Sequence, residues 1–134
     1  MNPIIFFAEA RIENGKVKVQ VKDSEIEMDP LGGDNPSPEE YFLASALACY
    51  LLTVNYIAKE KGVEIRELKG YIEGEMNLEG FYGKDGIPPG FLSIKMEVEI
   101  SPNDKLQEII EESNKRCPLK HTIENGVKIK ISIK

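Results

Sequence analysis

The feature that most constrains the fold is the run of residues 41–58, which carries no charged side chain. Helix start signals precede it, because Ser37 can cap a helix and Glu40 stands where a capping box places its acid. Gly62 follows the run and is typical of a left-handed helix stop. Apolar residues fall on every side of the helical wheel. The sequence therefore predicts a long helix that is buried all round, in a protein core or in a membrane.

A membrane-spanning helix is the first alternative, because residues 41–58 reach the minimum length for one. Three polar residues dilute the run, namely Ser45, Thr53 and Asn55, and acidic rather than basic residues precede it. The rest of the chain also contains one-faced strands that need an apolar element to cover. These features favour a buried central helix and no membrane partner.

Length, charge and cysteine content narrow the class of protein. With 134 residues, the chain has the size of one domain, and we expect a single domain over residues 1–134. The net charge of −6 argues against nucleic acid or an anionic membrane as a partner. No basic residue precedes Arg11, which is unlike a secretory signal. Cys49 and Cys117 are too few for a secreted disulfide scaffold, so we expect a cytoplasmic protein whose two thiols are redox-active, metal-binding or simply buried.

Strand patterns lie on both sides of the central helix. Alternation of apolar and polar residues predicts strands over residues 4–12, 16–22, 26–28, 63–78, 92–100 and 127–134. Asn14-Gly15 is typical of a two-residue hairpin turn. Gly70 and Gly74 are expected to weaken and bend the fourth strand. Glycines and prolines within residues 79–90 predict a loop.

The central helix needs more apolar cover than these strands supply. Each strand has one apolar face, so a sheet built from them covers one side of a helix. A second helix, expected from residues 101–104 to about Lys115, carries the narrow apolar stripe Leu106, Ile109 and Ile110. Either this helix alone covers the far side, or a second copy of the chain does so. The narrow stripe favours the second copy, with two sheets enclosing two central helices in a homodimer.

Two segments carry a resemblance to a known family. Residues 32–49, which end at Cys49, and the Cys117-Pro118-Leu119 segment far downstream resemble the OsmC/Ohr family. This family comprises osmotically induced protein C and the organic hydroperoxide resistance proteins. The resemblance implies an α+β fold in which antiparallel sheets wrap around long central helices in an intertwined homodimer. It also implies a peroxidase of the oxidative stress response that reduces organic hydroperoxides at the dimer interface with no cofactor. A dithiol, such as a lipoyl group, is the reductant that it implies.

The resemblance assigns roles to four residues. Cys49 falls on the peroxidatic position and Cys117 on the resolving one. Glu39 falls on the acid that family members pair with an arginine beside the reactive thiol. Glu13 stands at the position of that arginine, and Arg11, two residues earlier on the same face of its strand, is the candidate substitute.

The chemistry sets requirements beside the resemblance. A thiolate cuts a peroxide and becomes a sulfenic acid, which a second thiol condenses into a disulfide. Because burial raises a thiol pKa, Cys49 needs a nearby cation, and Arg11 oriented by Glu39 is the candidate. Glu39 and Cys49 lie about 15 Å apart along one helix axis, so a partner chain or the arginine must close the gap. Cys117 is expected in a mobile, electropositive turn beside Lys115, Arg116 and Lys120.

Other interpretations of these residues stay open. Cys49 is also suited to core packing, and Arg11 to a solvated strand surface. Cys49, Cys117 and His121 together suit a thiol metal site, although His121 also suits a surface turn. A third function class is a non-catalytic protein that binds a small apolar ligand around the helices. Titration of free thiols before and after stoichiometric organic peroxide separates these classes.

Overall fold

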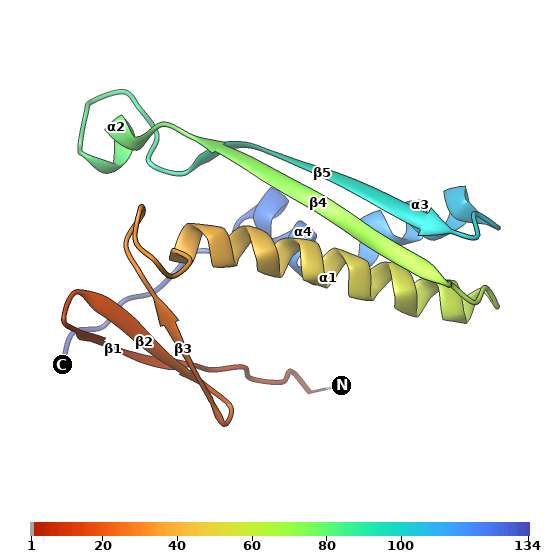
Figure 1. Ribbon diagram of the computed structural model, residues 1–134, viewed down its shortest axis with the longest axis horizontal. Helices are drawn as coiled ribbons and strands as arrows, with labels where there is room; N and C mark the ends of the chain where they lie inside the picture. Colours follow the sequence, from red (N-terminus) through yellow and green to blue (C-terminus); the bar gives the residue numbers. More distant parts are fainter. Residues whose placement is uncertain (1) are drawn as a thin grey trace. The chain divides into compact units, whose positions relative to one another are not determined.

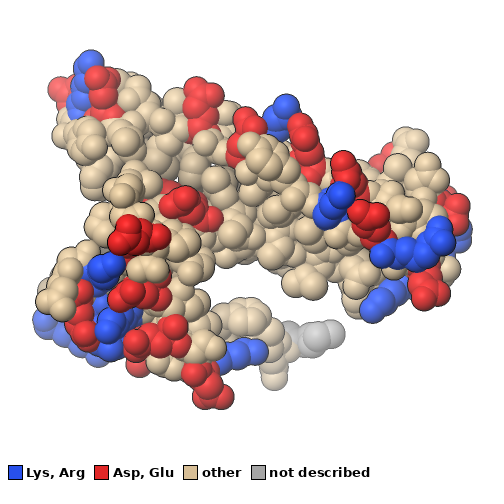
Figure 2. Space-filling view, in the orientation of Figure 1, with Lys and Arg blue, Asp and Glu red and all other residues tan. Residues whose placement is uncertain are grey.

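The computed structural model describes residues 2–134 and divides the chain into two compact units (Figure 1). The first unit ends at Phe42, and the second runs from Leu43 to Lys134. In chain order the elements are β1 (Glu9–Glu13), β2 (Lys16–Val21), β3 (Ser24–Met28), α1 (Pro38–Glu60), β4 (Glu67–Met76), α2 (Leu78–Phe81), β5 (Phe91–Ser101), α3 (Leu106–Arg116) and α4 (Pro118–Asn125). On the face shown in Figure 2, acidic and basic side chains are interspersed.

The first unit contains an antiparallel sheet in the order β1-β2-β3. Asn14 and Gly15 connect β1 to β2 with φ angles of 53° and 76°, which confirms the predicted hairpin turn. The strand predicted over residues 4–12 is shorter than expected, since β1 begins at Glu9. Its apolar N-terminal residues are exposed and pair with no strand among residues 2–134.

Helix α1 confirms the predicted long helix but not its burial on all sides, since Leu52 and Tyr56 are 70% and 59% exposed in the single chain. The Ser37 hydroxyl accepts a hydrogen bond from the Glu40 N–H at 3.2 Å, and the Glu40 carboxylate accepts one from the Ser37 N–H at 2.9 Å. These two bonds form the expected capping box. Gly62 has a φ of 76° and ends the helix, as predicted. Length and composition alone would let α1 cross a membrane, but the core helix of a soluble protein passes the same test.

The second unit contains the β4–β5 hairpin, which runs alongside α1 (Figure 1). Gly70 and Gly74 both pair in register with β5, opposite Val98 and Ile94, so neither interrupts the pairing, and the predicted bend of β4 stays a prediction. A Cβ at Gly70 would lie 2.9 Å from the Leu47 side chain, and one at Gly74 would lie 2.7 Å from Phe91. These glycines therefore make room for α1 and β5 side chains.

The core of the second unit forms where α1 meets α3 and the hairpin. Its buried members are Tyr50, Val54, Ile57, Ala58, Val63, Ile109 and Cys117. Hairpin side chains, including Leu68, Met96 and Val98, pack against this cluster. Cys117 is thus a member of the core and has the least exposed thiol of the chain.

The prediction of a strand over residues 127–134 is wrong for this chain, whose last helical element is α4. These residues alternate as a strand does, but they pair with no strand of residues 2–134. Their apolar side chains are exposed, with Ile131 at 82% and Ile133 at 90%. A strand needs a neighbour for its backbone hydrogen bonds, and the single chain offers none here.

Candidate active site

The two thiols meet in the second unit. Cys49 lies in the middle of α1, and Cys117 lies between α3 and α4, where it ends one helix and precedes the other. The Cys117 thiol donates a hydrogen bond to Cys49 Sγ, with 3.7 Å between the sulfur atoms. Both cysteines are free. The fold therefore brings two residues that are 68 positions apart into direct sulfur contact.

Helix α3 positions Cys117 against α1. Ile109 of α3 is fully buried in the same core cluster as Val54 and Ile57 of α1. Ser113 is also fully buried, and its backbone carbonyl accepts a hydrogen bond from the Cys117 N–H at 3.0 Å. The last turn of α3 thus fixes the Cys117 backbone in the core, and the thiol points toward α1.

The surroundings of Cys49 shift its ionisation in opposing directions. Burial raises the pKa of the Cys49 thiol, and the adjacent Cys117 thiol raises this pKa further. The backbone N–H of Leu119, in the first turn of α4, lowers the pKa of Cys49, as does Thr53, whose hydroxyl donates a hydrogen bond to the Cys49 backbone carbonyl at 2.8 Å. Burial is the largest of these effects. Cys49 is therefore mainly a thiol at neutral pH, with donors in place for a thiolate.

Cys49 opens onto a pocket, whereas Cys117 does not. The Cys49 pocket has a volume of about 340 Å³, and its walls are Cys49, Leu52, Thr53, Tyr56, Ile57, Arg116 and Pro118. Cys117 is only 1% exposed and is not part of these walls. The expectation of Cys117 in a mobile, electropositive turn is wrong, because α3 and α4 hold this thiol inside the core. Reactants from solvent reach Cys49 first.

Arg116, which the sequence analysis placed beside Cys117 without a role at Cys49, lines the same pocket. Arg116 forms a two-point ion pair with Glu60, at 2.8 Å through Nη1 and 3.2 Å through Nη2. Nη1 also contacts Glu112 at 3.4 Å, and the guanidinium lies 5.7 Å from the centre of the Tyr56 ring. Arg116 lowers the pKa of Glu60. The position of Arg116 directly before Cys117 was the available signal for its place beside the thiols.

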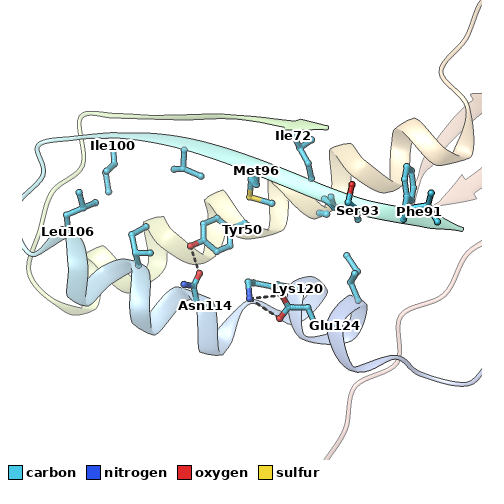
Figure 3. Close-up of a pocket in the computed structure, with 16 residues that line it drawn as sticks. Tyr50, Ile72, Phe91, Ser93, Met96, Ile100, Leu106, Asn114, Lys120 and Glu124 are labelled. Atoms are coloured by element: carbon cyan, nitrogen blue, oxygen red, sulfur yellow. Dashed lines mark hydrogen bonds and ion pairs between the residues drawn. The ribbon is translucent and has the colours of Figure 1, made fainter. Parts of the chain in front are cut away.

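A larger cavity, the sheet-side cavity, lies between β5 and the helices of the second unit (Figure 3). Its volume is about 730 Å³, and apolar side chains such as Ile72, Met96 and Ile100 dominate its walls. Tyr50 donates a hydrogen bond to Asn114 Oδ1 at 2.7 Å within it. Neither cysteine belongs to its walls. The sheet-side cavity is thus separate from the pocket that exposes Cys49.

The family model described as OsmC-like protein matches residues 31–132. The chain belongs to the OsmC-like protein family. The match extends from the loop before α1 to the C-terminal segment and includes both cysteines.

Curated relatives of this OsmC-like chain carry a common name. This chain is 22% identical over 110 residues to an organic hydroperoxide resistance protein of Xanthomonas axonopodis pv. citri, and the alignment covers 80% of this chain and 72% of the relative. It is 25% identical over 103 residues to the organic hydroperoxide resistance protein OhrB of Bacillus subtilis, covering 77% and 73%.

Solved structures show the same fold. An OsmC-like protein from Mycoplasma pneumoniae superposes with a TM-score of 0.78 at 24% identity, covering 90% of this chain and 88% of the other. The Legionella pneumophila organic hydroperoxide resistance protein OsmC gives a TM-score of 0.70 at 18% identity, with coverages of 97% and 96%. The α+β fold predicted from the sequence, with antiparallel sheets and long helices, is therefore confirmed.

Arg11 and Glu39 belong to the first unit of this OsmC-like chain. Arg11 forms ion pairs with Glu13 and with Glu25, at 3.3 Å for the latter. Both carboxylates raise the pKa of Arg11. Glu39 stands in the first turn of α1 and forms no ion pair within residues 2–134. The roles assigned to Arg11 and Glu39 stay predictions.

No ligand cluster among residues 2–134 supports the metal-site hypothesis. Within residues 2–134, no group of three or more His, Cys, Asp and Glu side chains is arranged to hold a metal ion. His121 lies on α4, where its side chain and carbonyl contact the Asn125 amide at 3.3 and 2.8 Å. The described part of the chain thus gives the two thiols no third metal ligand.

Proposed function

We propose that this OsmC-like chain, as a single domain over residues 1–134, is a peroxiredoxin-like reductase of organic hydroperoxides. The observation that carries the proposal is the 3.7 Å contact between the free thiols of Cys49 and Cys117. Only one of the two thiols opens onto a pocket. One accessible thiol and one buried partner in contact with it are the arrangement that oxidation followed by disulfide formation requires.

The reaction proceeds in two balanced steps. The Cys49 thiolate attacks the terminal oxygen of the hydroperoxide, an S–O bond forms, the O–O bond breaks, and the alkoxide takes up a proton to become an alcohol. The Cys117 thiolate then attacks the sulfur of the Cys49 sulfenic acid, an S–S bond forms, and hydroxide leaves as water after protonation. The thiols lose the two electrons that the peroxide gains. An external dithiol, such as a lipoyl group, restores both thiols by exchange.

The Cys49 pocket favours organic hydroperoxides over hydrogen peroxide. Leu52, Ile57 and Pro118 give it apolar walls, and the alkyl part of a substrate gains free energy by leaving water there. Hydrogen peroxide has no alkyl part and makes no such contact. The name of the curated relatives, organic hydroperoxide resistance protein, agrees with this substrate class.

A homodimer is part of the proposal. Leu52 and Tyr56 on α1 are 70% and 59% exposed, and the apolar side chains of residues 127–134 are exposed as well. A second copy that covered these side chains would give α1 the all-round burial that its sequence predicts. We place the protein in the cytoplasm, where dithiol reductants keep cysteines reduced.

Variants of the two cysteines test the division of labour. Cys49→Ser should abolish hydroperoxide consumption and leave Cys117 reduced. Cys117→Ser should consume about one equivalent and accumulate sulfenic acid, then sulfinic acid, at Cys49. Intact-mass spectrometry after peroxide treatment measures these additions. Oxygen addition to Cys117 in Cys49→Ser at the wild-type rate would reverse the assignment.

Arg11 and Glu39 enter the proposal as the arginine and the acid that the family resemblance implies beside Cys49. If Arg11 activates Cys49, Arg11→Ala slows the oxidation of Cys49 by peroxide. Glu13→Gln is the control, because it removes a charge from the same ion-pair group. An unchanged rate for Arg11→Ala would remove Arg11 from the mechanism.

A second candidate function is the binding of a small apolar ligand with little peroxidase activity. The observation that favours it is the sheet-side cavity, whose volume of about 730 Å³ matches that of small-molecule sites. Tyr50 and Asn114 supply polar groups within it. A binder of this kind would lose no thiols on addition of hydroperoxide.

A further inference from the structure

Cleavage of a peroxide creates a need for positive charge at a defined place. As the O–O bond breaks, negative charge develops on the alkoxide oxygen that leaves. In a pocket with apolar walls, this charge is costly unless a hydrogen-bond donor or a cation already faces it. The walls of the Cys49 pocket contain one cationic side chain, Arg116. This inference rests on the proposed peroxidase function and deepens it.

Arg116 is held in a fixed orientation. Glu60 binds its two terminal nitrogens, Glu112 binds one of them, and the Tyr56 ring lies beside the guanidinium. Such a two-point pair fixes the plane of a guanidinium, which a single contact does not. The contacts occupy both Nη1 donors and one Nη2 donor. The Nε–H and one Nη2–H have no acceptor among residues 2–134.

Glu60 and Arg116 come from two elements that the core holds together. Glu60 is the last residue of α1, and Arg116 is the last residue of α3. Ile57 of α1 and Ile109 of α3 are both fully buried and belong to one core cluster. Cys117, the residue after Arg116, lies against Cys49. The guanidinium and the two thiols therefore lie on the same two helices, α1 and α3, or directly after them.

We propose that Arg116, oriented by Glu60, binds the hydroperoxide beside Cys49 and stabilises the alkoxide that leaves. The free guanidinium N–H groups donate hydrogen bonds to the oxygen on which negative charge develops, while Cys49 attacks the other peroxide oxygen. Water supplies the proton that converts the alkoxide to the alcohol, and Arg116 keeps its own proton throughout. Glu60 acts as a positioning residue, because it contacts Arg116 and not the substrate.

This role predicts a separation between two reactions of Cys49. Burial has the largest effect on the pKa of the Cys49 thiol, and Leu119, Cys117 and Thr53 also change this pKa. Loss of Arg116 should slow the reaction with peroxide far more than alkylation by iodoacetamide, because alkylation creates no alkoxide. A residue that only supported the local fold would change both reactions.

The experiment measures both rates at Cys49 in wild type and in four variants. Arg116→Gln should lower the rate with cumene hydroperoxide about a hundredfold, as loss of a donor from an oxyanion site does, with the iodoacetamide rate within about twofold of wild type. Arg116→Lys keeps the positive charge but loses the paired N–H donors of the planar guanidinium, so it should give an intermediate rate with peroxide. Glu60→Gln should lower the peroxide rate less than Arg116→Gln does.

The matched control is Lys115→Gln, which removes a positive charge from the same exposed turn outside the Cys49 pocket. It should change neither rate. A peroxide rate for Arg116→Gln equal to that of Lys115→Gln would overturn the proposal, as would an equal fall in both reactions. Wild-type protein that fails to consume hydroperoxide would instead overturn the peroxidase function itself.

Discussion

Oxidation of Cys49 and Cys117 to a disulfide is expected to raise the free energy of unfolding by about 4 kcal/mol. The two residues are 68 positions apart, and the chain-entropy relation gives this value for a closed loop of that length. The sulfur atoms already lie 3.7 Å apart and must approach to about 2 Å. The small movement limits the strain that would oppose the gain.

Urea unfolding at one fixed protein concentration measures this gain. With a slope of about 2 kcal/mol per molar urea, the midpoint should rise by about 2 M after treatment with one equivalent of cumene hydroperoxide. The concentration must be fixed, because association changes apparent stability. Cys117→Ser is the control and should show no rise. Equal midpoints for reduced and oxidised wild type, or an equal rise in Cys117→Ser, would refute the reasoning.

Three further predictions concern the core, the thiol and the assembly. Tyr50→Phe should lower the free energy of unfolding by about 1 kcal/mol, because the hydrogen bond to Asn114 is lost. Asn114→Ala should lower this free energy less in the Tyr50→Phe protein than in wild type, and a double-mutant cycle of urea midpoints would show the difference. The rate of Cys49 alkylation should rise with pH through and above neutrality, because burial raises the thiol pKa, and a rate that is already constant at neutral pH would contradict this. Sedimentation at micromolar concentration should show a dimer, because the exposed apolar side chains of α1 need a second copy to cover them. A stable folded monomer would contradict this.

Local signals in the sequence predicted local structure correctly. The Ser37–Glu40 capping box and the Asn14-Gly15 turn depend on residues that are near neighbours in the chain, so their geometry follows from residue type. The family resemblance likewise placed Cys49 and Cys117 in one fold, although their separation in space was left open. The 3.7 Å contact supplies that separation.

Features that depend on distant residues were not predictable in the same way. Gly70 and Gly74 indicated a bend, because nothing local shows that Leu47 and Phe91 occupy the space where their side chains would lie. Residues 127–134 alternate like a strand, but a strand forms only with a neighbour. The Glu60–Arg116 pair joins residues 56 positions apart, and only the packing of α3 against α1 reveals it.

The most direct test of the central claim is a count of free thiols during titration with an organic hydroperoxide. Wild-type protein should lose two thiols per chain for each hydroperoxide consumed, with an intact mass lower by two hydrogen atoms. A dithiol should then restore both thiols. Consumption of hydroperoxide with no loss of thiols, or no consumption at all, would contradict the account.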